Sequence, residues 1–313
     1  MTGIVTTMRG RFAPSPTGAM HLGNARTALL AWLAVRRARG TMVLRLEDLD
    51  SARIAPGAEQ RLLDDLAWLG LDWDEGPHRQ SQRRAHYDTA LDRLLAGGRA
   101  FLCGCSRADV AGAVAAPHDA DEDGPRYPGT CRGRDPADVT AAARAAGRLP
   151  VVRFRGDGER ITFDDEICGV VEPIGQGVDD FVLRRADGVA AYQLAVVVDD
   201  ALMAVSHVLR GDDLLRSTPR QIALYRALGQ PAPRHAHVPL VLAPGGVRLA
   251  KRSRPVSIAD LRQAGVAAEV VVRALAASAG LLTAGARALP GDLIEDFDLA
   301  RVPRTPVVIE GLP

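Results

Sequence analysis

The first fifty residues carry the pattern that most limits how this chain can fold. RGRF, at residues 9–12, is a short apolar strand, and the chain then breaks at Pro14-Ser15-Pro16-Thr17-Gly18. Apolar residues recur at helical spacing from Leu22 to Leu33, and TMVLRLEDLD follows with the pattern of a second strand. A strand, a helix and a strand in this order form a βαβ unit, which implies a parallel sheet. We therefore predict an α/β fold.

Further elements follow this unit, with one interruption. Helical spacing predicts helices over 58–69, 81–96 and 217–228, and FVLRRADG, VSHVLRG and HAHVPLVLAP are typical of strands. AVVVDD fits a strand by its β-branched residues and a helix by its apolar spacing, so both interpretations stay open. From 101 to about 173, short apolar pieces alternate with Gly, Pro and Asp, which indicates an insertion. Alanine-rich helical segments follow Ser257.

Composition places the chain among ordinary globular proteins. Of its 313 residues, 47% are apolar and 25% are charged, and no apolar run approaches the roughly 18 residues of a membrane span. The N-terminus lacks the basic start and apolar middle of a signal peptide, so we expect a cytoplasmic protein without membrane contact. The net charge of +1 neither indicates nor excludes a nucleic-acid partner.

The segment HLGN, residues 21–24, lies at the turn between the first strand and its helix. Ligands of open parallel sheets bind at the carboxyl ends of strands, where a helix N-terminus offers N–H groups to phosphates. His21 can donate to phosphate oxygens, and Gly23 lets a flat base approach the backbone. The alternative is a proline-rich turn with a solvent-facing histidine, because a His-x-Gly pattern is short.

Lys251 is the one lysine among 39 basic Lys and Arg residues. Its ammonium is a compact point charge, whereas a guanidinium is a wide planar fork. The lysine in GVRLAKRSR is therefore either a chance survivor in an arginine-rich chain or the mark of a position where arginine cannot substitute.

These motifs resemble, in their order, the glutamyl-tRNA synthetase branch of the class I aminoacyl-tRNA synthetases. HLGN is similar to the HIGH signature of that class and RLAKRS to its KMSKS signature; LRLEDLD, AYQLAVVVDD and SHVLRGDDLLRSTPRQIALYRALG resemble the segments between them. The resemblance runs from Arg11 to about Ser257. It implies a Rossmann-like, doubly wound parallel sheet on which glutamate attacks the α-phosphorus of ATP.

The resemblance also implies the residues that bind ATP. They are His21, Gly23, Asn24 and Lys251, with His21 and Lys251 as the catalytic pair and with magnesium accompanying the nucleotide. Arg248 and Ala250 depart from the KMSKS signature, and their effect is left open.

Glutamate needs cations for its carboxylates and an anion for its ammonium. Arg11 ends the first strand and is suited to a bidentate grip on a carboxylate, while Arg210 offers a second contact. Glu47 closes the second strand, where it can face an ammonium; a surface acid is the alternative. The glutamate-binding residues implied by the resemblance are Arg11, Phe12, Ala13, Pro14, Ser15, Glu47, Tyr192 and Arg210.

Three of the four cysteines, Cys103, Cys105 and Cys131, cluster around a Gly/Pro-rich loop. In a reducing compartment this clustering favours a metal over a disulfide, and the thiolates suit one structural zinc ion per chain. The resemblance implies Tyr127 as the fourth ligand, with His118 as the competing candidate. Reduced cysteines without a metal remain the alternative.

Length and the cysteine cluster resemble short paralogues of this branch. Those proteins activate glutamate without tRNA and attach it to the queuosine base at the wobble position of tRNA(Asp). We therefore expect glutamate, ATP and queuosine-bearing tRNA(Asp) as partners, and no obligate protein partner. Arginines at 83–84, 132–134 and 184–185 could grip RNA or could simply be solvated.

The resemblance and the change of pattern from 101 to about 173 together predict the domain organisation. We expect residues 1–100 and 174–242 to form a split Rossmann-like catalytic domain, 101–173 a zinc-bearing insertion, and 243–313 the KMSKS-like loop with a short helical region and no anticodon-binding domain.

Three other functions compete with the transfer of glutamate to queuosine. They are a truncated glutamyl-tRNA synthetase that charges a tRNA 3′ end, a nucleotidyltransferase of the wider HIGH superfamily, and a non-catalytic RNA-binding paralogue.

Overall fold

The computed structural model describes residues 7–113, 120–121, 124–173, 175–242, 256–282, 288–309 and 312. The helices in these ranges are α1 (Leu22–Arg37), α2 (Ala58–Trp68), α3 (Arg84–Ala96), α4 (Arg107–Ala113), α5 (Pro136–Ala145), α6 (Tyr192–Leu202), α7 (Thr218–Ala227), α8 (Ile258–Gln263) and α9 (Ala268–Ser278). The strands are β1 (Arg9–Phe12), β2 (Thr41–Leu46), β3 (Glu75–Arg79), β4 (Ala100–Cys103), β5 (Ala120–Asp121), β6 (Gly124–Pro125), β7 (Val151–Phe154), β8 (Phe163–Asp165), β9 (Gly169–Val171), β10 (Val182–Arg184), β11 (His207–Gly211), β12 (Arg234–Val238), β13 (Val241–Leu242) and β14 (Val307–Val308).

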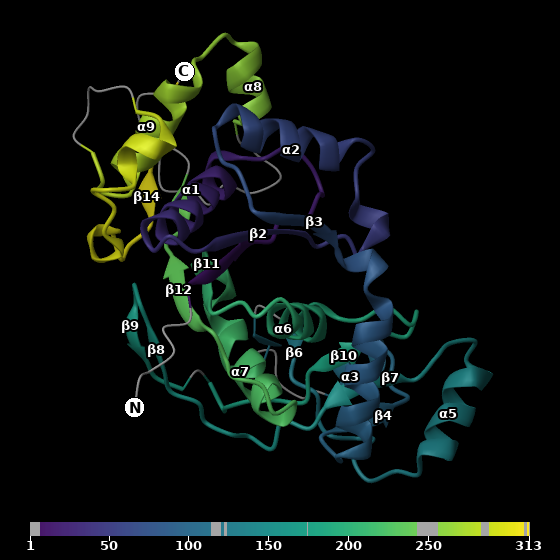
Figure 1. Ribbon diagram of the computed structural model, residues 1–313. Coiled ribbons are helices and arrows are strands. Elements are labelled where there is room, and N and C mark those ends of the chain that lie inside the picture. Colours follow the sequence, from purple (N-terminus) through teal and green to yellow (C-terminus); the bar gives the residue numbers. More distant parts are fainter. Residues whose placement is uncertain are drawn as a thin grey trace.

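A parallel sheet forms the centre of the molecule (Figure 1). Strand β1 pairs in parallel with β2, and β2 pairs in parallel with β3. On the other side, β11 lies against β1, where the Ser206 N–H donates to the Arg9 carbonyl at 2.9 Å, and β11 pairs in parallel with β12. The parallel sets β1-β2-β3 and β11-β12 therefore lie side by side, with β1 against β11, and this arrangement confirms the predicted α/β fold.

Helix α1 connects β1 to β2 and packs against β1, β11 and α9. Its sequence explains both ends: the His21 side chain caps the N-terminus, and two basic residues lie in the last turn beside the negative end of the helix dipole. Leu29, Leu30 and Leu33 are almost completely buried. The predicted βαβ unit is present, and its helix places HLGN at the carboxyl end of β1.

A second sheet is antiparallel and lies beside the first. Its strand order is β10-β7-β4, and helices α3 and α6 pack against it. The rings of Phe154 and Phe181 stack in this core with centroids 4.9 Å apart. The segment AVVVDD lies in α6, where seven consecutive residues, 194–200, are buried. Burial on all sides makes this stretch helical despite its β-branched residues, which settles the ambiguity left by the sequence.

Several strands differ from the sequence expectation. β8 and β9, which we expected inside the insertion, extend the main sheet, because Asp165 of β8 pairs in parallel with His235 of β12. β3 was not expected, since EGPHR has no apolar alternation. HAHVPLVLAP forms two strands rather than one, with β12 and β13 separated by Pro239 and Leu240, and β13 pairs with β14.

The alanine-rich region after Ser257 is helical, as predicted. Ser257 begins α8 with a capping box in which its side chain and that of Asp260 bond to each other's backbone N–H groups. Four residues named from the sequence, Arg248, Ala250, Lys251 and His118, lie outside the described residues. Within the described ranges, no helix combines the length and apolar character needed to cross a lipid bilayer.

Candidate active site

The HLGN turn presents a neutral histidine at the start of α1. The Asn24 N–H donates to Nδ1 of His21 at 3.2 Å. Burial lowers the pKa of His21, although the nearby Asp213 carboxylate opposes the shift. Because Nδ1 accepts a hydrogen bond, the ring proton of neutral His21 is on Nε2, where it can be donated to a ligand. A methyl group on Gly23 would lie 3.1 Å from the His21 ring, so glycine leaves this ring its space.

The segment that carries Lys251 is anchored at both ends beside this turn. On the C-terminal side, Ser257 forms an antiparallel bridge with His21, and the Ile258 N–H donates to the Met20 carbonyl at 2.8 Å. On the N-terminal side, Val241 lies 3.8 Å from the position that a Cβ on Gly23 would take. Val241 and Ser257, the described residues on either side of this segment, therefore both lie beside the HLGN turn.

Two arginines at the carboxyl ends of β1 and β11 are buried. Arg11 donates to the Leu209 carbonyl at 3.2 Å, and its Nε lies 3.7 Å from a carboxylate oxygen of Asp200. The Arg11 Nε is buried and makes no hydrogen bond within the described residues. Arg210 has no carboxylate within ion-pair distance in the described part of the chain, and burial lowers its pKa. A buried guanidinium without a counter-ion favours binding of an anion.

Glu47 and Tyr192 lie within the electrostatic range of these arginines. Burial raises the pKa of Glu47, although the charges of Arg45 and Arg11 oppose the shift. Burial also raises the pKa of Tyr192, and the charges of Arg210, Glu47 and Arg11 all act on its phenol. The structure thus gathers four sequence-predicted residues from β1, β11, the end of β2 and the start of α6.

The RFAPS segment reaches the same place through its backbone. Phe12 is buried in the main core, Ala13 and Pro14 are partly buried, and Ser15 is exposed. The Glu47 N–H donates to the Pro14 carbonyl at 3.0 Å, which joins the segment to the end of β2.

Sequence reasoning missed a buried charge network beneath this site. Arg45 donates to Asp200 at 2.6 Å and to Glu47 at 3.2 Å. Asp199 is completely buried and accepts hydrogen bonds from three side chains: Gln80 at 2.9 Å, Arg83 at 2.6 Å and Tyr87 at 2.8 Å. Two adjacent aspartates in the otherwise apolar AVVVDD were the available signal, because acids in a buried helix need cationic partners.

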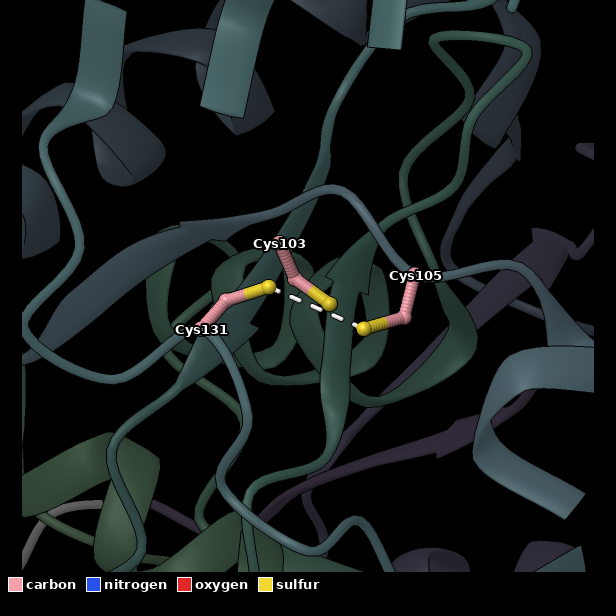
Figure 2. A group of neighbouring side chains, drawn as sticks. All are labelled: Cys103, Cys105 and Cys131. Atoms are coloured by element: carbon pink, nitrogen blue, oxygen red, sulfur yellow. Dashed lines mark hydrogen bonds between the residues drawn. The ribbon is translucent and has the colours of Figure 1, made fainter. Parts of the chain in front are cut away.

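The cysteine cluster lies at the C-terminal end of β4, where Cys103 is the last residue of the strand. Figure 2 shows its three side chains. The sulfurs of Cys103, Cys105 and Cys131 lie within 4.8 Å of one another, with 3.6 Å between Cys105 and Cys131. The phenol oxygen of Tyr127 lies 3.3 Å from the Cys103 sulfur and 3.8 Å from the Cys105 sulfur, and it accepts the Cys131 N–H at 2.8 Å. The end of β4 and the segment between β6 and α5 therefore bring the four predicted ligand residues together.

This donor set fits a tetrahedral metal. With Zn–S bonds of about 2.3 Å, tetrahedral angles place two sulfurs about 3.8 Å apart, which is close to the separations observed. Burial and the neighbouring Cys103 raise the pKa of Cys105 to about 12. A thiolate at Cys105 is therefore unfavourable unless a cation lies beside it, which a bound metal supplies.

The arginine pairs proposed as an RNA surface are largely engaged with acids. Arg83 contacts Asp199, as described above. Arg132 pairs with Asp180, and Arg185 pairs with the neighbouring Asp187. Much of their positive charge is therefore neutralised within the protein, which weakens the prediction that they grip RNA.

Comparisons with known proteins agree with this architecture. Residues 7–289 match the family described as tRNA synthetases class I (E and Q), catalytic domain. The chain is 54% identical to the glutamyl-Q tRNA(Asp) synthetase of Symbiobacterium thermophilum, over 96% of this chain and 95% of that protein. It is 49% identical to the protein of the same name from Nocardia farcinica, over 96% and 92%.

Full-length glutamate ligases match over a smaller share of their own length. Glutamate--tRNA ligase 2 of Acidithiobacillus ferrooxidans is 46% identical, over 88% of this chain and 59% of that protein. The crystal structure of a glutamate tRNA ligase from Elizabethkingia meningosepticum, in complex with its amino acid, superposes with a TM-score of 0.84 at 28% identity, covering 97% of this chain and 67% of that one. The chain is therefore an enzyme, a ligase that belongs to the family of class I tRNA synthetases (E and Q).

Proposed function

We propose that this enzyme activates glutamate with ATP, without tRNA, and transfers it from glutamyl-adenylate to the queuosine base at the wobble position of tRNA(Asp). The relatives named glutamyl-Q tRNA(Asp) synthetase support the acceptor, since the first two share 54% and 49% identity with the chain. Relatives named glutamate–tRNA ligase share 41% to 46%.

The observation that carries the amino-acid assignment is the buried Arg210, which lacks an acidic partner in the described part of the chain. Glutamate has two carboxylates and one ammonium. Arg11 and Arg210 supply cations for the carboxylates, and Glu47 supplies an anion for the ammonium. Glutamine has an uncharged side chain, so it would leave one of the two buried guanidiniums without an anion, which is costly.

The nucleotide is proposed to bind between the HLGN turn and the Lys251 segment. The His21 Nε2–H and the N-terminus of α1 offer donors to phosphate oxygens. Lys251 lies six residues before Ser257, so an extended chain of about 3.5 Å per residue keeps it within about 21 Å of that anchored residue. In the proposed reaction its ammonium stabilises the charge that develops on the departing pyrophosphate.

Cys103, Cys105, Tyr127 and Cys131 are proposed to hold one structural zinc ion. A bound zinc would cross-link the end of β4 to the loop that contains Tyr127 and Cys131. The cysteines pack in a different hydrophobic cluster from Phe12, the neighbour of Arg11, so the zinc site is assigned no step of the reaction.

The first test is ATP–pyrophosphate exchange without tRNA. Glutamate is expected to support exchange, whereas glutamine and aspartate are not. A Lys251→Ala variant serves as the background control. Exchange that responds to another acid but not to glutamate would favour the nucleotidyltransferase alternative, and absence of exchange in folded protein would favour a non-catalytic role.

The second test compares labelled glutamate transfer to three RNAs. They are tRNA(Asp) with queuosine, tRNA(Asp) without queuosine, and queuosine-bearing tRNA(Asp) that lacks its 3′-terminal adenosine. Labelling is expected on the first and third RNAs only. A requirement for the terminal adenosine, with indifference to queuosine, would instead identify an enzyme that charges the 3′ end.

A further inference from the structure

The guanidinium of Arg210 is held almost entirely by neutral acceptors. Nε donates to Nε2 of His237 at 3.0 Å, and Nη1 donates to Gln221 at 2.8 Å. Nη2 donates to the hydroxyl of Thr218 at 2.7 Å and to the Leu214 carbonyl at 3.4 Å. These contacts use four of the five N–H groups of a guanidinium, so the orientation of the fifth, on Nη1, is fixed.

The contact with His237 requires one particular form of the imidazole. Nε2 can accept the Arg210 Nε–H only if it carries no proton itself. The other tautomer, or the doubly protonated ring, would place an N–H group against the guanidinium N–H. The Thr218 hydroxyl accepts a hydrogen bond from Arg210 and lies 3.2 Å from the same Nε2, to which it can donate its own proton. These contacts favour the tautomer of His237 that carries its proton on Nδ1.

Asp165 provides the partner that keeps the proton there. One of its oxygens lies 2.6 Å from Nδ1 of His237, and both side chains are completely buried. Its other oxygen accepts the backbone N–H groups of Ile167 at 3.0 Å, Cys168 at 2.9 Å and His237 at 3.1 Å. Because four donors surround the carboxylate, Asp165 is held as an anion that accepts the Nδ1–H.

We propose that Asp165 and His237 are positioning residues for amino-acid recognition: Asp165 selects the His237 tautomer, and His237 aims the Arg210 guanidinium at a carboxylate of the substrate. This inference rests on the proposed function, because it takes glutamate as the ligand of Arg210. It gives the β8 strand, which the sequence placed in the insertion, a direct part in specificity.

The discriminating variant is Asp165→Asn. The amide keeps the shape of the carboxylate, but its NH₂ group can donate to Nδ1 and so move the ring proton to Nε2, against Arg210. The KM for glutamate is expected to rise about 10- to 100-fold, as for the loss of one hydrogen bond to a charged group. The KM for ATP is expected to stay within about twofold.

A second variant separates positioning from a merely structural role. His237→Gln can still present an oxygen to Arg210, and it no longer depends on Asp165 to set a tautomer. Asp165→Asn combined with His237→Gln is therefore expected to bind glutamate better than Asp165→Asn alone. His207→Gln is the matched control, because His207 lies at the opposite end of β11 and contacts Ser206.

The tautomer itself can be measured by ¹⁵N NMR of the imidazole rings. The wild-type protein is expected to show His237 protonated on Nδ1, and Asp165→Asn to show it protonated on Nε2. The proposal is overturned if wild-type His237 carries its proton on Nε2, or if folded Asp165→Asn keeps the wild-type KM for glutamate. If the wild-type enzyme shows no glutamate-dependent exchange, the proposed function fails instead, and the NMR result still tests the tautomer.

Discussion

His21 and Ser257 are joined by an antiparallel backbone bridge, although one begins the first helix and the other follows the Lys251 segment. The bridge fixes the return point of that segment against the turn proposed to bind ATP. Ser257, six residues after Lys251, is therefore held directly beside the N-terminus of α1.

Replacing Lys251 tests whether an ammonium is required. Lys251→Ala is expected to lower the exchange rate by about 10²- to 10³-fold, the usual effect of removing one group that stabilises developing charge. Lys251→Arg is expected to recover only part of this loss, because a planar guanidinium does not reproduce a compact charge. Steady-state exchange kinetics measure both variants. Wild-type kcat in Lys251→Arg would show that the lysine survived by chance.

Two substitutions at His21 separate capping from catalysis. Asn can cap the helix, so His21→Asn is expected to keep stability while it slows exchange. Ala cannot, so His21→Ala is expected to slow exchange and also to lose about 1 kcal/mol of stability. Urea unfolding and exchange rates measured on both proteins check the separation. Equal exchange rates in His21→Asn and the wild type would remove His21 from the catalytic pair.

The parts of the fold encoded by neighbouring residues could be predicted from the sequence. The turn at Pro14, the periodicity of α1 and the strand after Gly40 are local signals, and the structure contains all three elements. The pairing of β8 with β12 could not be predicted in this way. It depends on Asp165 and His237, which lie 72 residues apart, and no periodicity in either segment records the contact.

Some residues of the candidate site could also be predicted from the sequence, and others could not. Motifs located Arg11, Glu47 and the cysteine cluster, because each is typical of a known chemistry. They did not locate Arg45 or Asp199, which act only on other buried charges. Charged partners of this kind can be recognised only in the folded structure, because the residue that compensates a buried ion can lie anywhere in the sequence.

Glu47 is expected to make glutamate binding sensitive to pH. Its pKa is raised by burial, so as the pH falls it protonates before an ordinary glutamate does. A protonated Glu47 no longer attracts the substrate ammonium, so on acidification the KM for glutamate should begin to rise at a higher pH than protonation of an ordinary glutamate side chain would cause. Glu47→Gln should raise that KM about 10- to 100-fold and abolish this pH dependence. A Glu47→Gln profile parallel to that of the wild type would contradict the assignment.

Removing the proposed zinc is expected to destabilise the antiparallel sheet, whereas the proposed catalytic residues His21 and Lys251 remain in place. Purified protein should contain one zinc per chain by elemental analysis, and Cys131→Ser should contain much less. Tyr127→Phe removes one ligand but keeps the ring, and should weaken zinc retention against a chelator by a smaller factor. Cys168→Ser is the matched control, because its sulfur lies near the His237 carbonyl rather than in the cluster. Full zinc content in Cys131→Ser would refute the site.

The strongest effect on stability is expected at Asp199. Its carboxylate is fully buried between Gln80, Arg83 and Tyr87, and it lies 3.8 Å from Nε of the buried Arg45. Asp199→Ala leaves these donors and the Arg45 charge without their anion, and breaking such a buried arrangement costs about 3–5 kcal/mol.

A surface pair provides the control for that measurement. Asp187→Ala removes the carboxylate that pairs with Arg185, where both side chains are more than one-third exposed. Exposed pairs contribute at most about 1 kcal/mol, because water screens their charges. Urea unfolding of the two variants should therefore separate them by at least about 2 kcal/mol in the free energy of unfolding. Equal losses would mean that solvent reaches Asp199 and that the charge network beneath the amino-acid site does not stabilise α6.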